Sequence, residues 1–175
     1  MQSIKTISEY NEDIQMETHI LLQATLIGIG ATLIMDSWGI MQRLILGIPP
    51  LNYGLVARWI AGIPKGKWIH KTIMNTPSVW GENTLGWLLH YLIGVVFAIG
   101  HVYWAGETWL TSPTFTKAWL TGLVTLTFPY FIVQPCLGFG IAASKTPKPR
   151  LARALSLFTH TAYGAGLFLS ALLLS

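Results

Sequence analysis

The chain has 175 residues, of which 52% are hydrophobic and 10% are charged. A soluble domain carries about a quarter of its residues as charged side chains, so this composition excludes an ordinary soluble protein and predicts a membrane protein. The formal net charge is +4, but most of the basic residues lie in two loops. That distribution argues against a nucleic-acid partner and predicts contact with membrane lipids.

Four apolar stretches are each long enough to cross a bilayer as a helix, which requires about 20 residues. They predict an all-α, polytopic membrane protein in which residues 1–175 form a single transmembrane domain. A polar, acidic tail at 1–18 precedes the first stretch, where a cleaved signal peptide would be basic. The four expected transmembrane helices cover residues 19–41, 85–103, 118–141 and 152–174.

The Lys and Arg side chains are distributed unequally between the two sides of this predicted bundle. Nine of the eleven lie in or beside the loops 42–83 and 142–151, whereas Lys5 and Lys117 lie on the other side. Positive charge is typical of cytoplasmic loops. The distribution therefore predicts that both basic loops are cytoplasmic and that both termini lie across the membrane.

The first basic loop contains a segment, 51–63, whose apolar residues are spaced to line one face of a helix. Pro49 and Pro50 precede it and Pro64 follows it. A helix of this length measures about 20 Å and is too short to span a bilayer. We expect an interfacial or re-entrant helix, acting either as a lid over the bundle or as an interfacial anchor. The anchor is the favoured interpretation because amphipathic anchors are common.

Small and polar side chains recur every three or four residues along the predicted spans, so each set shares one helical face. Small residues at this spacing allow helices to approach closely, and we expect the bundle interior where these faces meet. The faces consist of Thr25, Gly28, Thr32, Asp36 and Gly39; Gly86, His90, Gly94, Ala98 and His101; Thr127, Tyr130, Gln134 and Gly138; and Arg153, Ser156, His160, Gly164 and Leu167.

Four polar residues, one from each span, lie at similar depths. Asp36, His90, Gln134 and His160 are each about 8 to 13 Å from the cytoplasmic end of their helix, at 1.5 Å per residue. An ionisable group inside the membrane indicates function by default. These four residues therefore form the predicted buried polar cluster, a candidate transport or ligand site.

The members of the predicted cluster do not all point equally to function. Asp36 is the strongest functional candidate, with a structural carboxylate bonded to a neighbouring histidine as its alternative. For the two histidines, a functional role and a structural role that ties helices together are equal alternatives, and Gln134 is expected to be structural. Arg58 and Glu82, at the two ends of the first basic loop, are candidates for a cytoplasmic gate over the cluster.

Three classes of function are compatible with this cluster. The favoured class is translocation of a small solute or ion, with Asp36, His90 and His160 forming the site. Because four helices packed on themselves leave little room for a pore, this class predicts a parallel homo-oligomer. The second class is a haem- or metal-binding membrane protein, with the same three residues as the candidate ligands.

The third class is an intramembrane enzyme that modifies a lipid, with Asp36 or Glu82 as the base. A zinc site would require Asp36, His90 and His160 to converge as three protein ligands, and the sequence contains no paired acid and histidine motif of the known kinds. No catalytic residue is therefore assigned, and the sequence requires no cofactor. An accessory subunit of a larger membrane complex is a further alternative.

Five segments carry a resemblance that covers most of the chain: GATLIMD, GIPPLNYGLVARW, GENTLGWLLHY, QPCLGFGIAASKTPKPR and THTAYGAGL. Together they resemble a family of small bacterial inner-membrane proteins known only as a domain of unknown function. The resemblance implies the bacterial inner membrane, and hence periplasmic termini, and a single four-helix domain. It assigns no role to any residue.

Overall fold

The computed structural model describes residues 7–175, with Lys5 and the rest of 1–6 outside the described part. The described residues form helices and turns and contain no strand. The helices are α1 (Ile7–Leu46), α2 (Gly54–Gly62), α3 (Glu82–Ala105), α4 (Thr108–Thr111), α5 (Phe115–Thr125), α6 (Gln134–Cys136) and α7 (Pro149–Leu172), with a π-helix η3 (Pro129–Val133) and the 3-10 turns η1 (Ile63–Lys65), η2 (Ile73–Asn75) and η4 (Ile141–Ala143).

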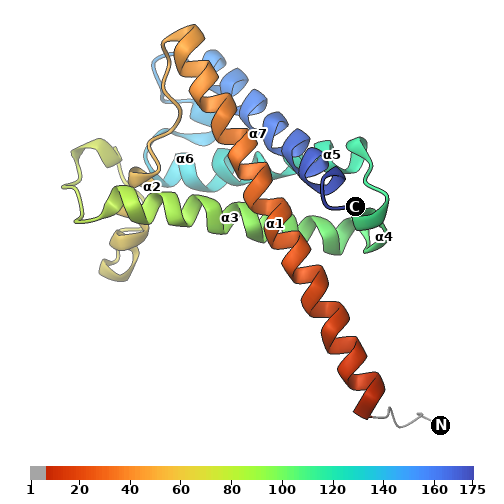
Figure 1. Cartoon of the computed structure of the whole chain (residues 1–175). Helices are drawn as coiled ribbons and strands as arrows, with labels where there is room; N and C mark the ends of the chain where they lie inside the picture. Colours follow the sequence, from red (N-terminus) through yellow and green to blue (C-terminus); the bar gives the residue numbers. More distant parts are fainter. Residues whose placement is uncertain (1–6) are drawn as a thin grey trace.

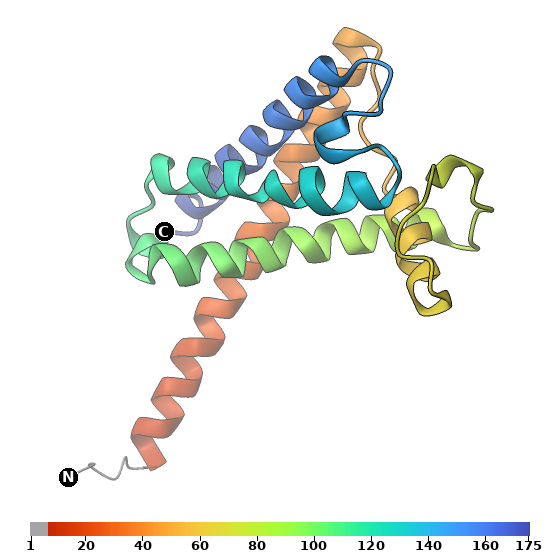
Figure 2. The same ribbon diagram turned by 180° about the vertical axis from the view of Figure 1, so that it is seen from behind.

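The helices form two layers that cross obliquely (Figures 1 and 2). One layer contains α7 and the second half of α1, and the other contains α3 and the segment from α5 to α6. The two basic loops lie on one side of the molecule, and α4 and the C-terminus lie on the opposite side. The loops that were predicted to share one side of the bundle therefore lie on the same side of the molecule.

Three helices are long and apolar enough to cross a membrane: Tyr10–Leu46 within α1, Glu82–Ala105 and Pro149–Leu172. They confirm that three of the four predicted stretches are continuous helices of membrane-spanning length. The first is longer than expected, because α1 continues through most of the predicted polar tail and ends at Gly47, whose φ of +66° breaks the helix before Pro49. The acidic residues of the tail are thus part of a helix and not of an extended segment.

The fourth predicted span, 118–141, is wrong as a single helix. It divides into α5, the π-helix η3 and the short α6. Pro129 and Pro135 have no N–H to donate to the preceding turn, and the backbone accommodates this with the wider π-turn, in which the N–H of Gln134 bonds to the carbonyl of Pro129. The segment ends at Gly138, where φ is +87° and a Cβ would lie 2.8 Å from the carbonyl oxygen of His70.

Close contacts between backbones hold the layers together. A Cβ on Gly28 of α1 would lie 2.7 Å from the Cα of Val95 in α3, and one on Gly166 of α7 would lie 2.7 Å from the Cα of Ala31. Gly28 also lies against Ala98 and the carbonyl of Gly94, which confirms that the predicted small-residue faces of α1 and α3 meet. The main core surrounds these contacts and contains Ala24, Ile27, Ala31, Ala98, Val102, Ala105, Trp109, Leu110, Ala118, Tyr163, Leu167 and Ala171.

A second core lies under α2, which confirms the predicted short helix in the first basic loop. The apolar face of α2 is not free to contact lipid, because Leu55 and Trp59 are buried against Ile73, Val133 and Leu137. The loop after α2 is tied down by backbone hydrogen bonds from Ile73 N to Leu137 O, at 2.9 Å, and from His70 N to Cys136 O. The helix therefore covers one end of the bundle.

Candidate functional site

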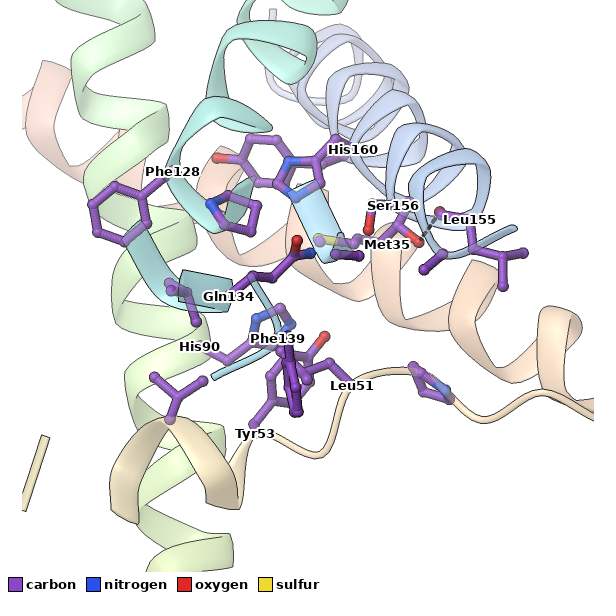
Figure 3. Close-up of a pocket in the computed structure, with 18 of the residues that line it drawn as sticks. Met35, Leu51, Tyr53, His90, Phe128, Gln134, Phe139, Leu155, Ser156 and His160 are labelled. Atoms are coloured by element: carbon purple, nitrogen blue, oxygen red, sulfur yellow. Dashed lines mark hydrogen bonds between the residues drawn. The ribbon is translucent and has the colours of Figure 1, made fainter. Parts of the chain in front are cut away.

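A cavity of about 610 Å³ lies between the two helix layers, and Figure 3 shows part of its lining. It extends from the loops at 48–53 and 143–148 to the level of Thr32, Phe97 and Tyr163, where the main core begins. Its wall is mostly apolar, with a few polar side chains from α1, α3, α6 and α7. Three members of the predicted polar cluster, His90, Gln134 and His160, line it.

The fourth member, Asp36, lies behind the cavity wall and holds His90. His90 Nε2 is 3.0 Å from Asp36 Oδ1, and the Tyr91 hydroxyl donates to Asp36 Oδ2 at 2.9 Å. Because a carboxylate only accepts hydrogen bonds, Nε2 of His90 carries the hydrogen. A single carboxylate of α1 is therefore satisfied by two donors of α3, as expected for an ionisable group inside a helix bundle.

Tyr53, from the loop before α2, covers the other face of His90. The two rings are stacked with centroids 3.8 Å apart and an interplanar angle of 15°. Burial raises the pKa of Tyr53, and the nearby charge of Asp36 raises it further, so the phenol keeps its proton. The imidazole is thus held between a carboxylate at its edge and an aromatic ring on its face.

His160 of α7 is held by Thr125, the last residue of α5. Its Nδ1 lies 2.9 Å from the Thr125 hydroxyl, which also donates to the carbonyl of Gly122 at 2.7 Å. The two contacts place α5 against α7 at the depth of the cavity. Gln134 approaches from the remaining wall, and its Oε1 is buried without a hydrogen-bond partner in the described residues. In Figure 3 the side chains of Gln134, His160 and His90 point toward the same space.

Arg58 and Glu82, the predicted gate, form a two-pronged ion pair outside this cavity. Arg58 Nε donates to Glu82 Oε2 at 2.8 Å, and its second nitrogen contacts Glu82 Oε1. Arg58 also donates to the carbonyl of Thr76 at 2.9 Å. The pair fastens α2 to the start of α3, and neither residue lines the cavity.

The three candidate metal ligands are not brought together as a ligand set. Within residues 7–175, no group of three or more His, Cys, Asp or Glu side chains is arranged to hold a metal ion. Asp36 and His90 already bond to each other, and His160 uses Nδ1 to contact Thr125. The geometry gives no support to the metal alternative.

Sequence reasoning missed three residues of the site. Tyrosines in membrane helices are expected to fill space or to lie at an interface, and Tyr91 was predicted to do the same. Tyr53 lies in a loop with no motif, and Thr125 lies in the broken span. Only Tyr91 had a usable indication in the sequence, since it directly follows His90. In contrast, His101, which shares the predicted face of His90, bonds to Thr121 in the main core and does not line the cavity.

Comparison with known proteins yields one match. No curated protein and no solved structure is significantly similar to this chain. A single family model covers residues 25–174, and therefore includes the cavity, α2 and all three membrane-length helices except the first part of α1. The chain belongs to the family described as protein of unknown function (DUF2938).

Proposed function

We propose that this protein is an integral membrane protein of the bacterial inner membrane that binds a small, largely apolar molecule in the cavity between its helix layers. The membrane part of the proposal is supported by the three membrane-length helices and by the apolar side chains on their outer surface. Leu33 is 52% exposed, Leu88 64% and Val96 55%. Large exposed apolar surfaces are rare on soluble proteins.

The cavity is the observation that carries the proposal of binding. Its volume of about 610 Å³ lies within the range of about 300 to 1,000 Å³ that is usual for small-molecule sites. An apolar wall with a few oriented polar groups is also typical of such sites. In this proposal the basic loops face the cytoplasm, so the cavity opens toward that side.

Filling the cavity tests the proposal. Ala152 of α7 lines the cavity, whereas Ala154 lies on the exposed surface of the same helix. We expect native mass spectrometry of the whole chain in mild detergent to show a bound small molecule on the wild type and on Ala154→Trp. The bound molecule should be absent from Ala152→Trp. Equal retention by both variants, or no bound mass on the wild type, would contradict the proposal.

Translocation of a small solute through the same site is the second candidate function. One observation favours it: the cavity ends inside the bundle, at polar groups from several helices, as does the binding site of a transporter that is open to one side. Passage would require the core beyond Tyr163 to open. Uptake of a solute into proteoliposomes that is abolished by Ala152→Trp and kept by Ala154→Trp would make translocation the favoured function. The parallel homo-oligomer is proposed only as part of this second candidate.

A further inference from the structure

The hydrogen-bond partners of His160 determine which of its nitrogens carries the hydrogen. The hydroxyl of Thr125 has one hydrogen, and it donates this to the carbonyl of Gly122 at 2.7 Å. Toward His160 Nδ1, at 2.9 Å, the hydroxyl oxygen must therefore accept. Nδ1 carries the hydrogen, and Nε2 of the neutral ring is left as an acceptor on a side chain that lines the cavity.

The same argument applies to His90. Its Nε2 donates to Asp36, so in the neutral form of the ring Nδ1 is an acceptor, and no hydrogen bond to it is present among the described residues. Gln134 lines the same cavity, but its Oε1 is enclosed by the protein, and its amide NH2 adds donors and not an acceptor. Two acceptors from two helices therefore lie on side chains that line one cavity, with no protein donor to either among the described residues. A ligand that presented only acceptors would leave both of them unpaired, at a cost in affinity.

We propose that the bound molecule is an amphiphilic alcohol, whose hydroxyl hydrogen is donated to His160 Nε2 while its chain occupies the apolar part of the cavity. This inference rests on the proposed function, because it names the class of ligand for the same site.

A pair of matched probes tests the proposed ligand class separately from the proposed binding in the cavity. The probes are dodecan-1-ol and its methyl ether, each carrying the same photoreactive diazirine in mid-chain, added to the whole chain in phosphatidylcholine nanodiscs. The ether keeps the oxygen but has no hydrogen to donate. We expect the alcohol to label peptides that line the cavity, such as those around Phe97 and Leu155, about tenfold more than the ether, since one unpaired buried acceptor weakens binding by roughly that factor.

Two variants and one control connect the preference to the histidine. His160→Phe removes the acceptor and keeps the ring volume, so the ratio of alcohol to ether labelling should fall to about one. Thr125→Val keeps the histidine but removes its hydroxyl partner, which frees the other tautomer and should lower the ratio partway. Thr125→Val also tests the inference if His160→Phe does not fold. His19→Phe, on the exposed part of α1, should leave the ratio unchanged.

The possible results are distinguishable. Preferential labelling by the alcohol that is lost in His160→Phe, or lowered in Thr125→Val, supports the inference. Equal labelling of the cavity by both probes overturns the inference but leaves the proposed function intact. A preference that persists in both variants also overturns the inference. Labelling by neither probe inside the cavity contradicts the proposed function itself.

Discussion

Asp36 accepts hydrogen bonds from two consecutive residues of α3, His90 and Tyr91. Consecutive side chains on a helix point about 100° apart, so they reach a common carboxylate only because Asp36 lies over the groove between them. The contact fixes the rotation of α3 relative to α1 as well as the distance between the two helices. It also sets the tautomer of His90 that the cavity presents to a ligand.

Removing this carboxylate should destabilise the protein more than removing either donor. Asp36→Ala leaves two half-buried donors without a partner, and each such loss costs about 1 to 3 kcal/mol. We expect a loss of about 3 kcal/mol in the free energy of unfolding for Asp36→Ala and of about 1 kcal/mol for Tyr91→Phe. Unfolding by SDS in mixed micelles measures both values.

Ser37→Ala is the matched control for this measurement. Ser37 is exposed and bonds only within its own helix, to the carbonyl of Leu33. Its substitution should change the free energy of unfolding by less than about 0.5 kcal/mol. A change for Asp36→Ala as small as that of the control would show that the contacts of the carboxylate contribute nothing to stability.

The sequence predicted part of this residue pattern and not the rest. Asp36 and His90 could be placed at one depth because both lie on continuous helices with a regular rise per residue. Gln134 and His160 were also expected there, and they line the same cavity. Tyr53 could not be predicted, because the path of a loop depends on contacts between segments that are distant in the sequence and not on a local periodicity.

At the scale of the elements, the layers depend on glycines that face a neighbouring backbone. Gly166→Ala should push α7 away from α1, because its Cβ would lie 2.7 Å from the Cα of Ala31. We expect a loss of about 1 to 3 kcal/mol, as is usual for overpacked contacts. The same SDS titration measures this loss.

Gly100→Ala is expected to have the opposite effect on the stability of the same bundle. Nothing lies within 4 Å of a Cβ at Gly100, which is part of α3. Alanine favours the helix by up to about 1 kcal/mol over glycine, so this variant should be neutral or slightly more stable. If Gly166→Ala behaved like Gly100→Ala, α1 and α7 would not pack as closely as the structure has them.

The ion pair between Arg58 and Glu82 makes a testable connection between α2 and the second core. Cys136, the single cysteine of the chain, packs against this core and is only partly exposed. Glu82→Ala removes the carboxylate that fastens α2, so we expect the rate of Cys136 alkylation to rise severalfold. A maleimide reagent followed by mass spectrometry gives this rate directly.

Glu107→Ala removes an exposed carboxylate at the other end of α3 and should leave the alkylation rate unchanged. Unchanged labelling in Glu82→Ala as well would show that other contacts hold α2 in place. The sequence predicted the position of α2 from its apolar spacing and flanking prolines. It could not predict what the apolar face would contact, because lipid and protein interiors favour the same side chains.

Across the whole molecule, the two basic loops lie on one side (Figure 1). If that side is cytoplasmic, a reporter that functions only in the periplasm should be active when fused after Ser175. A reporter that functions only in the cytoplasm should be inactive at the same site and active in the loop at Gly66. The reverse pattern would contradict the proposed orientation.

The continuity of the third expected helix is where the sequence-based prediction of the whole molecule was wrong. Hydrophobicity alone identified four stretches, but the third contains Pro129 and Pro135. Hydrophobicity summed over a stretch does not include the backbone hydrogen bonds that each proline removes. The broken stretch forms part of the cavity wall with Phe128, Val133 and Gln134. Departures from regular helix are tolerated in a membrane where they line a cavity, so the wrong prediction and the cavity have one cause.

The length of α1 has a consequence for how the chain moves. Its 40 residues extend about 60 Å at 1.5 Å per residue, and among the side chains described, none before Ala24 is buried. The first part therefore depends on its own backbone hydrogen bonds, which are marginal in an isolated helix. Backbone amides should exchange with deuterium slowly from Ala24 to Thr32 and progressively faster toward Ile7, so that one continuous helix contains both the most protected and the least protected amides of α1.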